Sequence, residues 1–148
     1  MSILKETLDI DNEGWINNVI INRAFTNDQI KNIFNEHSKD VILYGELGQP
    51  KHNKNNMTVI EYINRTSYVD SSRIACGFRN ITPSVDAEGN CILTASIKFR
   101  EPDVNQTILL DAYLAGSIVF AHRALVNKRH DLPDEIVKVV AFDVIITD

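Results

Sequence analysis

The chain has 148 residues, a formal net charge of -5 and 44% hydrophobic residues. This length fits one domain, and folding should bury roughly two-thirds of the surface that the unfolded chain exposes. The aliphatic content excludes disorder as the main state. No apolar run approaches the roughly 18 residues that a membrane span needs, and the first residues lack the basic and apolar pattern of a secretory signal peptide.

The acidic balance argues against a protein that coats nucleic acid, because phosphate binding requires a basic surface. The most basic run, Lys128-Arg129-His130, is predicted to be part of a solvated loop. Cys76 and Cys91 are too few for a disulfide framework and are interpreted as small buried hydrophobic residues. Because the histidines are scattered, no metal site and no cofactor are predicted.

The chain is predicted to begin with a polar arm, residues 1–13, followed by a single domain over residues 14–148. The first strand is expected within residues 15–25, with a bulge. Thr26 then starts a helix, because Gln29 three residues later completes a capping box. The helix is expected to end near Ser38 and to present one face composed of Ile30, Ile33, Phe34 and His37.

The middle of the chain contains a predicted β-hairpin. A strand over residues 71–82, a turn at 86–90 and a returning strand over 91–99 show the alternation expected for paired strands. Before the hairpin, residues 40–44 predict a short strand and residues 45–56 a loop. Residues 57–63 are compatible with either a helical turn or the start of a strand.

After the hairpin, residues 105–115 predict a helix that ends at Gly116 and turns Ile108, Leu109 and Leu114 toward the core. A buried strand is expected over 117–125, a loop over 127–135 and a final strand over 136–146, which is rich in β-branched residues. The fold class is therefore α+β: a small, mainly antiparallel sheet or barrel with two or three flanking helices.

Hydrolase and nucleotide-binding signatures are absent from the sequence. Five segments in order nevertheless resemble motifs of the prohead core proteases of tailed phages, which are serine proteases with a herpesvirus-assemblin-like fold. Residues 44–50 (YGELGQP) resemble their G-E-L-x-H-P loop, and residues 73–81 a strand that contains their catalytic His. Residues 86–89 match a turn, residues 119–124 the nucleophile segment and residues 141–145 the closing F-D-[IV]-V strand.

The resemblance, which spans residues 15–148, implies a protease fold that has lost its catalytic groups. Cys76 stands where the family has its catalytic His, and Ala121, or His122 after a shift of one residue, stands where it has Ser. Gln49 replaces the loop His. Because a serine hydrolase needs a hydroxyl group activated by a base, no catalytic residue is expected, and Cys76, Ala121 and His122 are interpreted as vestigial positions.

Three local alternatives stay open. Cys76 and His122 could form a swapped dyad, with the thiol as nucleophile and the imidazole as base. The loop at residues 45–50 is either a simple turn or a retained contact surface. Arg123 either lies near the former oxyanion site or pairs with Asp143 on a neighbouring strand. The candidate binding residues are Gly45, Glu46, Leu47, Gly48, Gln49, Pro50 and Arg123.

The function expected from the resemblance is a non-enzymatic phage head protein: a minor capsid, decoration or assembly component of the virion head, present in the host cytoplasm during assembly. Its partners would be capsid or scaffold proteins, with no nucleic acid and no membrane, and self-association is left open. The alternatives are an inhibitor or regulator of the active prohead protease, a divergent protease using Cys76 and His122, and another virion component of the neck or tail.

Overall fold

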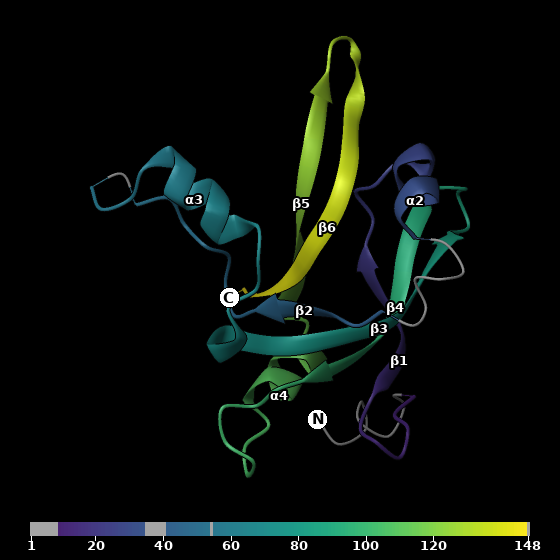
Figure 1. Ribbon diagram of the computed structural model, residues 1–148. Coiled ribbons are helices and arrows are strands. Elements are labelled where there is room, and N and C mark those ends of the chain that lie inside the picture. The colour runs from purple at the N-terminus through teal and green to yellow at the C-terminus, as the bar shows by residue number, and fades with distance from the viewer. Residues whose placement is uncertain (1–8, 35–40, 54, 148) are drawn as a thin grey trace.

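The computed structural model describes residues 9–34, 41–53 and 55–147, and its fold is α+β (Figure 1). In chain order the elements are β1 (Ile16–Asn22), α2 (Asn27–Ile33), β2 (Leu43–Glu46), α3 (Val59–Thr66), the 3-10 helix η2 (Ser71–Arg73), β3 (Ile74–Val85), β4 (Cys91–Phe99), α4 (Ile108–Leu114), β5 (Ile118–Arg129) and β6 (Leu132–Ile146).

The strands form two antiparallel sheets, which confirms the predicted mainly antiparallel α+β class. One sheet has the order β1-β4-β3-β2 and the other is the two-stranded ribbon β5-β6. A parallel bridge between Leu47 and Val144 joins the sheets where β2 ends against β6. The strands of the described part of the chain do not close into a barrel.

Strand β1 and helix α2 form as the local sequence predicts. Strand β1 shows the predicted bulge, with register shifts against β4 and a positive φ of 59° at Asn18. Helix α2 has the predicted capping box: the Thr26 hydroxyl oxygen accepts from the Gln29 backbone N–H, and the Gln29 side chain accepts from the Thr26 N–H. Ile30 and Phe34 are buried, while His37 and Ser38 lie outside the described residues.

Part of the predicted N-terminal arm is described, namely residues 9–13. This segment folds back on the beginning of β1, where Ile10 forms a bridge with Ile16. The Asp11 carboxylate accepts hydrogen bonds from the backbone N–H groups of Glu13 and Trp15. Residues 1–8 of the arm lie outside the described residues.

The segment around β2 corrects the sequence prediction. Gly45 and Glu46 belong to the strand rather than to the predicted loop, because β2 crosses β6 at very short range. A Cβ atom added at Gly45 would lie 1.8 Å from the Phe142 carbonyl oxygen, so only glycine permits this approach. The undecided segment that follows is helical and forms α3, whose N-terminus is capped by Thr58 and Glu61.

Strands β3 and β4 confirm the predicted hairpin. The Asp86 carboxylate accepts from the N–H groups of Glu88 and Asn90, and Gly89 has a φ of 83°, which together define the turn. One boundary is corrected: residues 71–73 form η2, because the Asp70 side chain accepts from the Ser72 N–H and caps a helical turn there. The cysteines of the hairpin are free thiols.

Helix α4 is shorter than predicted and begins at Ile108. Its first N–H groups donate to the Glu101 carboxylate, which caps the helix from outside: Leu109 N–H to Oε1 at 2.8 Å and Leu110 N–H to Oε2 at 3.0 Å. Leu109 is buried as predicted, but Ile108 is half-exposed because it lies at the solvent side of this first turn. Gly116 ends the helix with a φ of 76°.

The C-terminal half of the chain differs most from its prediction. Residues 127–135 are not a loop, since β5 and β6 continue to a tight turn at His130 and Asp131, where Asp131 has a φ of 58°. Along β5 only Arg123 is buried, although the strand was expected to be buried. Residues 125–129 of β5 are exposed, so polar and charged residues are accommodated there, whereas on β6 the Asp134 carbonyl accepts from the Gln29 side chain of α2. Lys128 and Arg129 are exposed as expected, but they lie in β5.

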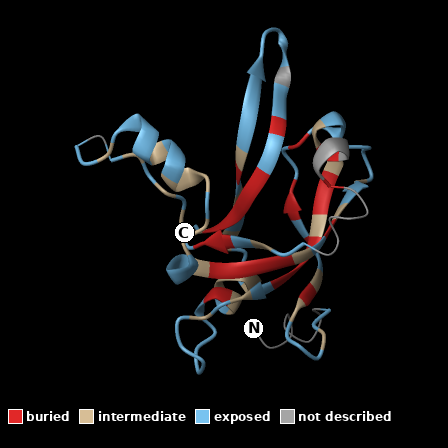
Figure 2. Cartoon of the chain, in the orientation of Figure 1, coloured by how far each residue is buried: buried red, intermediate tan, exposed pale blue. Residues whose placement is uncertain are grey.

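The core lies between the two sheets. Figure 2 shows buried residues on the four-stranded sheet and along β6, whereas α3 and the outer part of β5 are mostly exposed. Ile136, in the outer part of β6, is buried as well. Phe78 is fully buried and its ring lies 5.3 Å from that of Phe120 and 5.5 Å from that of Phe142, centroid to centroid. These contacts anchor the inner half of the ribbon to the larger sheet.

Candidate functional site

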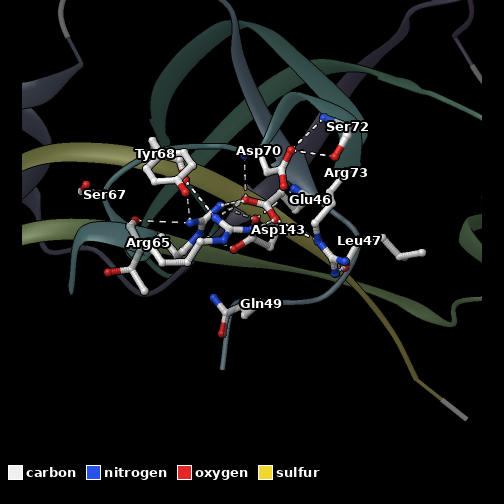
Figure 3. Close-up of polar contacts among 12 residues, drawn as sticks. Glu46, Leu47, Gln49, Arg65, Ser67, Tyr68, Asp70, Ser72, Arg73 and Asp143 are labelled. Carbon is white, nitrogen blue, oxygen red and sulfur yellow. Dashed lines mark hydrogen bonds and ion pairs between the residues drawn. The ribbon is translucent and has the colours of Figure 1, made fainter. Parts of the chain in front are cut away.

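Two carboxylates are fully buried where the sheets meet: Glu46 at the end of β2 and Asp143 in β6. Burying a carboxylate without a partner is very costly, so each must be compensated nearby. Three arginines supply this compensation: Arg123 from β5, Arg65 from the last turn of α3 and Arg73 from η2 (Figure 3). We call these five residues the arginine-carboxylate cluster.

Glu46 is the centre of the cluster. Its Oε2 accepts from Arg123 Nη2 at 2.9 Å and from Arg65 Nη1 at 3.0 Å, and its Oε1 accepts from Arg65 Nη2 and, at 3.2 Å, from Arg73 Nε. The backbone N–H of Asp70 adds a bond at 3.1 Å. Burial by itself raises the pKa of the Glu46 carboxyl, but the hydrogen bonds and positive charges outweigh burial and lower the pKa below its usual value.

Arg123 pairs with Asp143, which confirms one of the two alternatives for this arginine. Its Nε lies 2.6 Å from Asp143 Oδ2 and its Nη2 lies 3.1 Å from Oδ1. Its Nη1 donates to the carbonyl oxygens of Thr66, at 3.2 Å, and Tyr68, at 3.0 Å. A single side chain therefore connects the ribbon, the end of β2 and the segment that follows α3.

The cluster also holds the loop at residues 47–50 in place. Leu47 donates its N–H to the Arg73 carbonyl at 3.1 Å, and its own carbonyl accepts from Arg73 Nη2 at 3.0 Å. The Gly48 N–H donates to the Val144 carbonyl at 2.8 Å. Gln49 Nε2 lies within 3.4 Å of the Ala121 carbonyl oxygen and 3.3 Å of that of His122. The loop therefore lies against both strands of the ribbon.

A pocket of about 1070 Å³ opens between this loop and α3. Positive side chains predominate on its wall, with Lys51, Arg65 and Arg73 against the single carboxylate of Asp70. The His52 ring stacks on Tyr62 with centroids 5.0 Å apart, which gives the α3 side an aromatic wall. The pocket is lined by Leu47, Gly48, Gln49, Pro50, Lys51, His52, Tyr62, Arg65, Asp70, Arg73, Val144, Ile145 and Ile146.

The three vestigial positions, Cys76, Ala121 and His122, each have different contacts. Cys76 is fully buried in β3, where its thiol donates to the Gly77 carbonyl at 3.5 Å, and burial raises the pKa of this thiol far above its ordinary value. His122 Nδ1 lies 3.1 Å from Asn22 Nδ2, and burial lowers the pKa of its ring. Among the described residues no hydrogen bond joins Cys76 to His122. Ala121 lies opposite Asp143 in the ribbon.

Of the predicted binding residues, Glu46 and Arg123 belong to the cluster, Leu47 to Pro50 line the pocket, and Gly45 lies beneath β6. Sequence reasoning missed the roles of Arg65 and Arg73. The sequence did carry a signal in the acidic partners of these arginines. Glu46 follows the apolar strand run that ends at Tyr44, and Asp143 interrupts the apolar run of the last strand. Carboxylates in such positions are rarely buried without a cationic partner.

Comparison with protein-family models, with curated proteins and with solved structures finds no match to this chain. Within the described part of the chain, no group of three or more His, Cys, Asp or Glu residues is placed to hold a metal ion. None of the described helices is long and apolar enough to cross a membrane.

Proposed function

We propose that this protein is a noncatalytic, prohead-protease-like component of a tailed-phage head that acts by binding capsid or scaffold chains. The observation that carries the proposal is the convergence of the resembling segments. Four of the five contribute one charged side chain each to the same cluster: Glu46, Arg73, Arg123 and Asp143.

The state of the vestigial positions favours binding over chemistry. Acyl transfer requires an exposed nucleophile next to a base. Ala121 has no nucleophilic atom, and the thiol of Cys76 is buried and held protonated by the raised pKa. We therefore assign the function to a protein-binding surface, which is formed by the loop at residues 47–50 and by α3.

A preorganised surface for such a partner lies beside the pocket. The loop at residues 47–50 is fixed by backbone hydrogen bonds, so little conformational entropy would be lost when a partner binds it. Helix α3 has no buried residue and presents an apolar face of Val59, Ile60 and Ile63, which are 61%, 71% and 53% exposed. An exposed apolar patch next to a polar, rigid loop is typical of protein interaction sites.

Two measurements test the proposal. Mass spectrometry of separated phage heads and tails should find the chain with the heads; its presence with tails or necks would contradict the assignment. In a binding assay with purified capsid and scaffold proteins, Ile60→Asp should weaken association at least about tenfold, whereas Val104→Asp, which places the same charge at a 97% exposed site of a different loop, should not. Equal effects of the two variants would exclude α3 as the contact.

A further inference from the structure

Arg73 lies between two pockets that adjoin at its side chain. The first is the pocket of about 1070 Å³ described above, and the second, of about 430 Å³, lies between η2 and the start of α4. Leu47, Arg73 and Ile146 line both pockets, and we call the two together the Arg73 groove. Figure 3 shows Arg73 at the Leu47 side of the arginine-carboxylate cluster.

The Arg73 groove is more positive than the rest of the chain, whose formal net charge is -5. Three arginines of the cluster beneath it share two buried carboxylates, which leaves one positive charge in excess. On the groove wall, positive side chains outnumber carboxylates: Lys51, Arg65, Arg73 and Arg100 face Asp70 and Glu101. Both of these carboxylates are already engaged, by Ser72 and by the first N–H groups of α4.

Three of these cations have donors that a ligand can reach. Lys51 and Arg100 are exposed, and neither has an ion-pair partner among the described residues. The Arg73 side chain is 54% exposed. Its Nε and Nη2 donate to Glu46 and to the Leu47 carbonyl, but its Nη1 donates to no described residue. Carboxylates accept strong, charge-assisted hydrogen bonds from such groups.

The backbone of β6 also offers hydrogen bonds to the groove. The Thr147 N–H donates to the Ser117 carbonyl at 2.7 Å. Ile146 therefore forms a non-hydrogen-bonded pair with Ile118, and its own N–H and C=O groups point away from β5. On that side the bridge to the loop stops at Val144, and the backbone of Ile146 has no partner among the described residues. A peptide in an extended conformation supplies the complementary groups.

We propose that the Arg73 groove binds an extended, acidic peptide segment of a protein partner. Carboxylates of the segment accept hydrogen bonds from Lys51, Arg73 and Arg100, and its backbone pairs with Ile146. Its apolar side chains cover Leu47 and Ile146, which are 44% and 49% exposed. The inference rests on the proposed function, because it names the chemistry of the chain that the proposed surface binds.

Isothermal titration calorimetry of the full chain tests this inference with a synthetic peptide of about eight residues that alternates glutamate and valine. The same peptide with glutamine in place of glutamate should bind at least about tenfold more weakly, because it lacks the charges. Lys51→Gln and Arg100→Gln should each weaken binding of the acidic peptide at least about threefold. Lys128→Gln is the matched control, since it removes the same charge from an exposed site on β5 and should leave binding unchanged.

Equal binding of the two peptides would overturn the inference, and so would equal effects of Lys51→Gln and Lys128→Gln. Tighter binding of an oligodeoxythymidylate of matched charge would also overturn it, because the groove would then be a site for a phosphate backbone. If the acidic peptide does not bind while the chain still associates with capsid or scaffold proteins, this inference alone fails. If the peptide binds but the chain is absent from phage heads, the proposed function alone fails.

Discussion

Arg123 donates hydrogen bonds with all three of its guanidinium nitrogens, to Asp143, to Glu46 and to two backbone carbonyls. This planar, multidentate geometry explains why an arginine occupies the position. A lysine ammonium is a compact point charge and cannot reproduce the paired contacts with Asp143. At the scale of the single residue, Arg123 is the link between the ribbon and the rest of the molecule.

We expect Arg123→Met to lower the free energy of unfolding by about 3–5 kcal/mol, because two buried carboxylates would lose a partner. Urea unfolding monitored by circular dichroism measures this loss. Lys128→Met on the same strand is the matched control and should change stability by less than about 0.5 kcal/mol, since its side chain is exposed. Equal losses in the two variants would show that the buried pairs contribute no more than a surface charge.

At the scale of the element, β2 is the clearest case of a strand defined by its neighbour. Its first two residues lie in the predicted strand over 40–44, but Gly45 and Glu46 have little local strand signal, and glycine ordinarily disfavours strands. The strand exists because it pairs with β3 on one side and passes beneath β6, where it delivers Glu46 to the cluster.

Gly45→Ala should therefore be severely destabilising, with a loss of more than about 3 kcal/mol or failure to fold, because the new methyl group would overlap the Phe142 carbonyl. Gly77→Ala in β3 is the control. There the added carbon would make ordinary contacts, the nearest at 3.5 Å from Trp15, and should cost about 1 kcal/mol or less. Thermal unfolding of both variants compares them, and similar melting temperatures would refute the close approach.

At the scale of the whole molecule, the cluster couples stability to pH. The pKa of Glu46 is lowered in the folded state, so its contribution to stability is present above the unfolded pKa and is lost as pH falls through the folded value. The carboxyl groups of Asp11, Asp70 and Asp86 also have lowered pKa values, chiefly because of hydrogen bonds. All four groups act in the same direction, so the fold should lose stability in acid.

We expect the free energy of unfolding to fall slightly below about pH 6.5, because the lowered pKa of His122 lets the unfolded chain bind a proton that the folded chain does not, and to fall more steeply below about pH 4.5. Glu46→Gln should flatten this acid slope, because the amide cannot bind the proton that the unfolded carboxylate takes up. Glu88→Gln, a change at an exposed position, should keep the original slope. Urea titrations between pH 3 and pH 7 measure the free energy of unfolding of the unsubstituted protein and of both variants. If the pH dependence of Glu46→Gln were parallel to that of the unsubstituted protein, the role assigned to Glu46 would be contradicted.

Several elements follow from the sequence by itself. The capping box of Thr26 and Gln29, the hairpin around Gly89 and the β-branched C-terminal strand were predicted at nearly their observed positions. Each depends on residues close together in the chain: a cap, a turn residue or a local alternation. The Arg123–Asp143 pair was also identified as an alternative, because both residues lie in runs expected to be neighbouring strands.

Only the tertiary structure decided the rest. The strand state of Gly45 and Glu46 depends on β6, which lies about a hundred residues away in the chain. The continuous ribbon from Arg123 to Ala141 replaces a predicted loop because cross-strand pairing overrides the local preferences of its polar residues. Arg65 and Arg73 reach Glu46 only because α3 and η2 return to the end of β2. The physical reason is the same in each case. Buried charges and close backbone contacts are made between residues far apart in the chain, and local sequence patterns do not show which distant residues will come together.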